Sequence, residues 1–217
     1  MKISKTTMEV LKNFASINSN ILVRKGNVLS TISTGVNIFS RAEVTETFDR
    51  EFAIYDLNSL LALLTMMEDT DVDFGEDCIT ISKDTSEFKY YYADKSIIVA
   101  APDKTIEVDN HYEFNLTATM IDTMKRAAAV ISAPMLSVVA KNGLVKMSVG
   151  DPSTPRSNTY TQDIGEFDGE FDCRIPIENF KVISANYVTV LSKKKFMYLS
   201  NDKTKYWLAL DPNSQIG

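Results

Sequence analysis

The sequence predicts an α+β protein made of two similar domains, each with two helices packed on one side of an antiparallel sheet. A helix and strand pattern in the first half of the chain recurs in the second half. Alternating apolar residues lie beside glycine turns in both halves, as is typical of hairpins. The 217 residues are 44% hydrophobic, which is enough core material for two domains of ordinary size.

The first repeated element is a helix, at residues 3–16 (ISKTTMEVLKNFAS) and again at 116–130 (LTATMIDTMKRAAAV). Apolar residues in both segments recur with the helical period. Ser4 in one segment and Thr117 in the other stand at the position where a helix N-cap belongs. We therefore expect two equivalent helices.

Each helix is followed by a two-strand pattern around a glycine. Residues 20–33 (NILVRKGNVLSTIS) contain a Lys-Gly turn, and residues 135–149 (MLSVVAKNGLVKMSV) contain an Asn-Gly turn. Both patterns predict a β-hairpin.

The second repeated element is a strand leading into an apolar helix, at residues 50–67 and 170–184. In the second copy we expect the helix near 177–184. Further strands follow in each half, at CITISK and SEFKYYYAD in the first and at NYVTVLSK, KKFMYLSND and TKYWLAL in the second. The predicted domains are residues 1–105 and 113–217, joined by a polar connector at 106–112.

The predicted helices expose cations although the chain carries a formal charge of −6. Lys5 and Lys12 are seven residues apart, so they point within about 20° of each other on one helix. Arg126 lies near the centre of the exposed side of the 118–131 helix, with Lys125 beside it. Such a surface suits contact with phosphates without reading bases. The alternative is an ordinary solvated face.

An acidic stretch at residues 69–77 (DTDVDFGED) has some features of a calcium loop. However, Gly75 falls one place late for that motif, and Thr80 stands where the bidentate Glu belongs. Apolar residues alternate with the acids, so we predict a strand.

The sequence offers no catalytic motif. His111, the only histidine, is interpreted as a surface residue rather than a catalytic base. Cys78 and Cys173 lack a metal-ligand spacing and are interpreted as buried reduced thiols. We expect no enzyme activity, cofactor, metal site, secretion signal or membrane span, and an intracellular protein.

Five stretches, in order along nearly the whole chain, resemble a known family. They are MKISKTT, LKNFASINS, AIYDLN, IGEFDGEF and ENFKVISANYVTVLSKKK. The chain carrying them is similar to the DNA polymerase sliding clamps (processivity factors) of T4-type bacteriophages. That resemblance implies a DNA-clamp fold assembled as a homotrimeric ring that encircles double-stranded DNA and tethers the replicative DNA polymerase. It also implies an ATP-dependent clamp loader, assistance to late viral transcription, and a place in the cytoplasm of the infected bacterial host.

The resemblance also implies where the functional residues lie. The side chains facing DNA are expected to be Lys5, Lys12, Asn13, Lys125, Arg126 and Lys181. The ring is expected to close by pairing residues 87–94 with residues 157–165 of the next subunit, through Phe88, Tyr90, Tyr91, Tyr92, Thr159, Tyr160 and Thr161. A partner-peptide pocket is expected at Val36, Ile38, Ile106, Val108, Leu210 and Pro212. Ordinary edge-strand packing and core membership are the alternatives for the last two sets.

A competing function is a two-domain protein-binding scaffold that does not enclose DNA. It explains the duplication and the acidity, and treats the lysines as solubilising. The mass of the particle in solution distinguishes the two functions, because the clamp requires three chains per particle.

Overall fold

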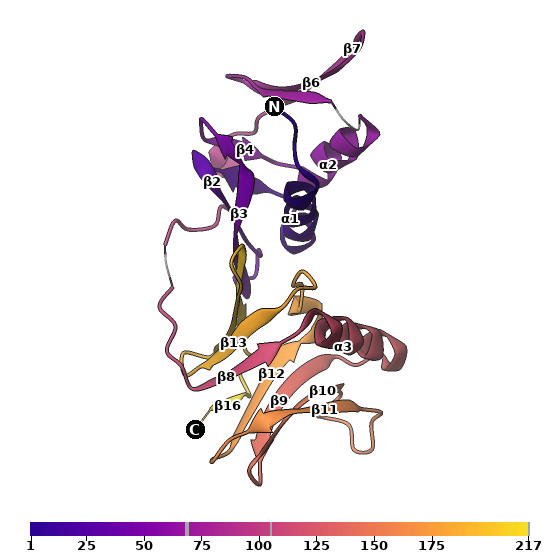
Figure 1. The fold of residues 1–217 in the computed structure, drawn as a ribbon, viewed down its shortest axis with the longest axis vertical. Helices are drawn as coiled ribbons and strands as arrows, with labels where there is room; N and C mark the ends of the chain where they lie inside the picture. The colour runs from indigo at the N-terminus through magenta and orange to yellow at the C-terminus, as the bar shows by residue number, and fades with distance from the viewer. Residues whose placement is uncertain (68–69, 105, 217) are drawn as a thin grey trace. The chain divides into compact units, whose positions relative to one another are not determined.

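The computed structural model describes residues 1–67, 70–104 and 106–216. The chain divides into two compact units, residues 1–104 and 105–217, each with its own helices and strands (Figure 1). The expected domain limits at residues 105 and 217, and Asp69 of the acidic stretch, lie outside the described residues.

The described residues of unit 1 form two α-helices, seven strands and a short 3-10 helix. They are α1 (Lys5–Ile17), β1 (Ile21–Val23), β2 (Gly26–Ile32), β3 (Ile38–Phe48), β4 (Phe52–Ile54), α2 (Leu57–Met66), β5 (Asp71–Phe74), β6 (Cys78–Lys83), β7 (Ser86–Tyr91) and η1 (Lys95–Ile97). All pairings are antiparallel: β1 with β4, β2 with β3, and the meander β5-β6-β7. The acidic stretch forms β5, so the strand prediction for its described part is confirmed.

Helix α1 begins where the sequence predicts. The Ser4 hydroxyl accepts a hydrogen bond from the Thr7 amide, which satisfies one of the free N–H groups of the first turn. Val10, Leu11 and Phe14 are buried on the opposite side from Lys5 and Lys12. The amphipathic pattern therefore fixes which face of α1 reaches solvent.

A buried carboxylate holds the start of α1. Glu46 of β3 is 8% exposed and accepts hydrogen bonds from the Ser4 amide and the Thr7 hydroxyl. Burial alone raises the pKa of Glu46, but the bonds from Thr7 and Ser4 outweigh it and keep that pKa below its usual value. A negative charge is also favourable at a helix N-terminus.

Between residues 106 and 216, unit 2 forms one α-helix, nine strands and a short 3-10 helix. They are β8 (Tyr112–Leu116), α3 (Ala118–Ile131), β9 (Met135–Lys141), β10 (Leu144–Gly150), β11 (Tyr160–Glu166), β12 (Phe171–Pro176), η2 (Ile177–Asn179), β13 (Tyr187–Ser192), β14 (Phe196–Ser200), β15 (Thr204–Ala209) and β16 (Gln215–Ile216). One sheet has the order β11-β10-β9-β12-β16, and β8, β13, β14 and β15 pair in the order β8-β13-β14-β15. Helix α3 packs on β10 and β11 (Figure 1).

Two local predictions for unit 2 are confirmed. The Thr117 hydroxyl accepts a hydrogen bond from the Met120 amide and caps α3. Residues 135–149 form the β9–β10 hairpin, whose turn residues Asn142 and Gly143 have φ angles of 53° and 81°. Both angles lie in the left-handed region that an Asn-Gly turn of this type requires.

The hairpin predicted over residues 20–33 is wrong. Strand β1 pairs with β4, with Leu22 opposite Ala53, while β2 pairs with β3, with Leu29 opposite Ala42. All three residues of β1 are buried, so this strand finds its apolar partner about thirty residues along the chain rather than across the nearest turn.

The prediction of a fourth helix near 177–184 is also wrong, both in the length of the helix and in its type. Only the 3-10 turn η2 forms, and Phe180 and Val182 beyond it are both buried. A spacing of two between buried residues belongs to extended chain, not to a helix. Asn179, the last residue of this turn, is buried as well.

Candidate functional site: exposed helix faces and open strand edges

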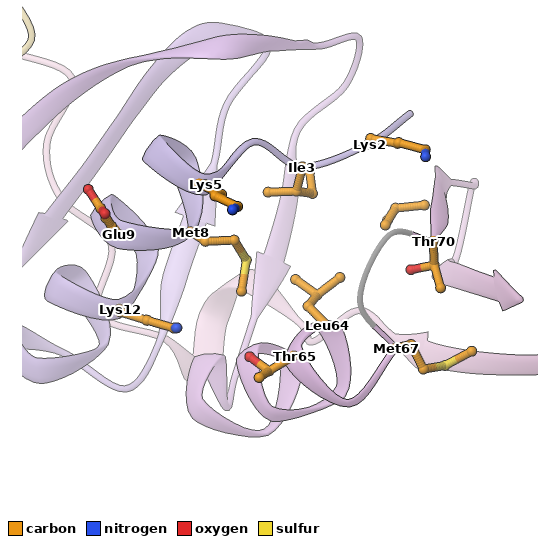
Figure 2. Close-up of a pocket in the computed structure, with 11 residues that line it drawn as sticks. Lys2, Ile3, Lys5, Met8, Glu9, Lys12, Leu64, Thr65, Met67 and Thr70 are labelled. Carbon is orange, nitrogen blue, oxygen red and sulfur yellow. The ribbon is translucent and has the colours of Figure 1, made fainter.

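The exposed face of α1 lines a hollow surface groove. Lys5 and Lys12 are both exposed, as predicted, and lie across a hollow from Leu64 and Thr65 of α2 (Figure 2). Lys2 also lines this groove, whose volume is about 490 Å³. The α1 side of the groove therefore carries Lys5 and Lys12 together with one acid, Glu9, and side chains of α2 lie on the other side.

Helix α2 contributes no charge to this surface. Its exposed residues include Asn58, Ala62 and Thr65, and Met66 is 70% exposed. The Asp56 carboxylate caps the helix by accepting a hydrogen bond from the Ser59 amide at 3.1 Å.

The two cations of α3 differ in their surroundings. Arg126 is exposed. The Lys125 ammonium instead donates to the Val182 carbonyl at 2.6 Å and lies 5.8 Å from the ring centre of Phe180. Burial lowers the pKa of Lys125. Because its amine is held within unit 2, Lys125 is less accessible than Arg126, and its place among the DNA-facing residues stays a prediction.

The other two residues expected to face DNA are half-buried. Asn13 lies in α1 next to Lys12, and Lys181 follows η2 in extended chain rather than in a helix. The exposed cations on the described α-helices are therefore Lys5 and Lys12 in unit 1 and Arg126 in unit 2.

Strand β7 is an edge strand of its sheet and carries the predicted aromatic residues. Tyr91 is 67% exposed, and Phe88 is exposed as well. The Tyr90 hydroxyl donates to the Asp56 carbonyl at 2.9 Å, and the Tyr92 ring stacks on Phe52 at 4.8 Å. Phe88 and Tyr91 thus remain available to a partner, whereas Tyr90 and Tyr92 largely serve unit 1.

Strand β11 is likewise an edge strand, pairing only with β10 among the described strands. Tyr160 and Thr161 in this strand are exposed, as is Thr159 just before it. Both segments expected to close the ring therefore carry an open row of backbone groups.

The residues expected to form the partner-peptide pocket are divided between the units. Val36, at a turn with a φ angle of 57°, is exposed, whereas Ile38 is buried. In unit 2, Leu210 is buried, so it and Ile38 fit the core-membership alternative. The remaining residues of that set, Ile106, Val108 and Pro212, are at least partly accessible.

His111 is not a simple surface residue. Its ring packs 5.3 Å from Phe167 and 5.7 Å from Phe171, and burial, followed by the charge of Lys193, lowers the pKa of His111. Within residues 1–67, 70–104 and 106–216, no group of three or more acidic, His or Cys side chains is placed to hold a metal ion. No helix in these ranges is long and apolar enough to span a membrane.

Sequence reasoning missed two contacts that position these surfaces. Glu46 holds the start of α1, and Tyr90 binds the backbone just before α2. The signal for Glu46 was its place between Val44 and Phe48, which puts an acid on the buried side of a strand.

Comparison with known proteins identifies which proteins have a similar sequence and a similar fold. Residues 2–100 match the sequence model of the family described as "DNA polymerase processivity factor". The chain is 28% identical to the "Sliding clamp" of Enterobacteria phage T4, over 99% of this chain and 98% of that protein. It is also 28% identical to the "Sliding clamp" of Vibrio phage KVP40, over 86% of this chain and 88% of that protein. The solved structure of A. fulgidus PCNA bound to the C-terminal region of FEN-1 matches with a TM-score of 0.73 at 13% identity, covering 99% and 98% of the two chains.

The fold is thus that of the DNA clamps, and the predicted fold class is confirmed. Within that class, the chain is similar to the sliding clamps of T4-type bacteriophages over nearly its whole length, as its sequence stretches predicted.

Proposed function

We propose that this protein is a phage sliding clamp that encircles duplex DNA as a homotrimer and tethers the replicative polymerase. The observation that carries the proposal is the similarity to phage clamps over nearly the whole chain, on a fold whose exposed helix faces bear Lys5, Lys12 and Arg126. These cations contact phosphates without sequence preference. The acidic remainder of the surface repels DNA from other faces.

Each chain supplies two clamp domains, residues 1–105 and 113–217, with 106–112 as connector. Asn13 and Lys181 flank the cations and complete the DNA-facing set. The ring closes between β7 of one copy and β11 of the next. An ATP-dependent loader opens it, and partner peptides dock at the accessible connector residues. Assistance to late viral transcription, in the host cytoplasm, belongs to the same proposal.

The decisive experiment tests enclosure. Loaded onto circular DNA by its ATPase, the protein persists while the circle is intact and leaves after a single double-strand cut. Bulky proteins bound at both new ends restore retention. Equal dissociation rates from intact and cut circles contradict the proposal.

A protein-binding scaffold responds to neither the cut nor the end block. Its particle mass in solution also need not equal three chains. Sedimentation of the unmodified protein therefore separates the two functions before any DNA experiment.

A further inference from the structure

The backbone of β7 has a defined open side. The Tyr92 amide donates to the Asp77 carbonyl at 3.0 Å, towards β6. Residues of an antiparallel strand alternate between bonding one neighbour and the other. Tyr90 and Phe88 therefore also bond towards β6, and the backbone groups of Lys89 and Tyr91 point to the open edge.

The same argument applies to β11. The two-residue turn at 142–143 makes Lys141 and Leu144 the closing hydrogen-bonded pair of the β9–β10 hairpin. Alternate residues of β10 therefore bond towards β11, where Met147 lies opposite Gln162. The backbone groups of Thr161 and Asp163 are left pointing to the open edge.

The side chains follow the same alternation. Phe88 lies opposite buried Ile81, so it faces the covered side of its sheet. Tyr160 lies opposite buried Val149 and faces the covered side of its own sheet. The pairing of β11 with β10 is irregular at Ile164, between Asp163 and Gly165. Over the regular part of β11, antiparallel pairing of the two edges can join covered side to covered side only if Lys89 and Tyr91 lie opposite two of the residues Thr159, Thr161 and Asp163.

Charge and overlap then select one register. Placing Lys89 opposite Asp163 makes an ion pair, whereas the register two residues away places Glu87 opposite Asp163 and sets like charges against each other. The first register also places the whole of β7 opposite residues 161–166 of β11, with Phe88 opposite the irregularity at Ile164.

We propose that copies of the chain join through β7 and β11 in this register, with Lys89 of one copy opposite Asp163 of the next and Tyr91 opposite Thr161. The proposal rests on the ring described above and names its contact. Asp163 lies 3.7 Å from the Lys146 amine of its own chain, so pairing creates a row of alternating charge across three strands.

Cysteine cross-linking tests the register. Lys89→Cys with Asp163→Cys puts two thiols on directly opposite residues, whose Cα atoms lie about 4.5–5.5 Å apart, within disulfide range. The matched control, Lys89→Cys with Thr161→Cys, is displaced by two residues, roughly 6.6 Å along the strand, and is out of range. Both variants also carry Cys78→Ser, because Cys78 lies close by on β6.

Under mild oxidation the first variant is expected to form covalent dimers and trimers that a thiol reductant reverses, while the control remains as single chains. Cys173 stays in place, because burial raises the pKa of its thiol to about 12. Efficient linking of the control, or trimers by sedimentation without linking of the first variant, overturns the register while leaving the ring intact. Single chains at every concentration of the unmodified protein overturn both.

A charge exchange provides a second test without cysteine. Lys89→Glu alone raises the concentration at which trimers dissociate by about three- to tenfold, the effect of turning an exposed attraction into repulsion. Adding Asp163→Lys together with Lys146→Glu, which keeps residues 146 and 163 of one chain oppositely charged, brings the value back towards that of the unmodified protein. A variant with all three changes that dissociates at a still higher concentration contradicts the pairing.

Discussion

Replacing Glu46 by Gln tests how α1 is held in place. The Glu46 carboxylate is nearly inaccessible to water and accepts bonds from Ser4 and Thr7. A hydrogen bond to a charged group contributes about 1.5–3 kcal/mol, and the amide keeps the shape and one acceptor, so we expect a loss of about 2 kcal/mol at pH 7. For a chain of this size that lowers the unfolding midpoint by about 4–8 °C.

The loss is expected to depend on pH with a definite sign. Because the pKa of Glu46 is lower in the folded protein than its usual value of 4.5, the carboxylate stabilises the fold above that value. The contribution disappears as the pH falls through the lower folded pKa. Thermal unfolding of both proteins at one fixed concentration, from pH 7 down to acid, measures the difference, since assembly otherwise shifts the midpoint. A gap that stays constant over this range refutes the reasoning.

Three further predictions concern the surfaces. Lys12→Glu with Arg126→Glu shortens retention on circular DNA, with the largest difference from the unmodified protein at low salt because salt screens the contacts, while Lys203→Glu, on an exposed turn, changes it little; equal effects of both contradict a cationic helix face. Lys125→Met lowers the free energy of unfolding by about 1–3 kcal/mol, because a buried carbonyl loses its donor, but leaves the salt dependence of retention unchanged. Tyr91→Ala makes trimers dissociate at higher concentration in sedimentation, because the contact loses aromatic area, and an unchanged dissociation curve places the contact elsewhere.

Local signals in the sequence were sufficient for the helices and for one hairpin. Ser4 and Thr117 cap their helices because a hydroxyl beside free amides needs no distant partner. The Asn-Gly turn sets the β9–β10 hairpin in the same local way. These features were predictable because all the groups involved lie within a few residues.

Features that depend on distant contacts were not predictable. Strand β1 pairs with β4 rather than with β2, because this pairing buries the apolar residues of β1 in the core of the unit. The helical period predicts the side of α3 on which Lys125 lies. It does not predict that the Val182 carbonyl, 57 residues along the chain, accepts a hydrogen bond from the Lys125 amine. In the same way, the sequence identified the exposed lysines of α1 but not the carboxylate of Glu46 behind them.

In helix α1, the residues that hold the helix in place differ from the residues that its exposed face presents to a partner. The start of the helix is held by hydrogen bonds among Ser4, Thr7 and Glu46, and its inner face is held by buried apolar side chains. Lys5 and Lys12 belong to neither set of contacts. Surface substitutions away from structural features typically change stability by less than about 0.5 kcal/mol. Single substitutions on this face can therefore raise or lower its charge. They are expected to change its affinity for a polyanion while the stability of the fold stays the same.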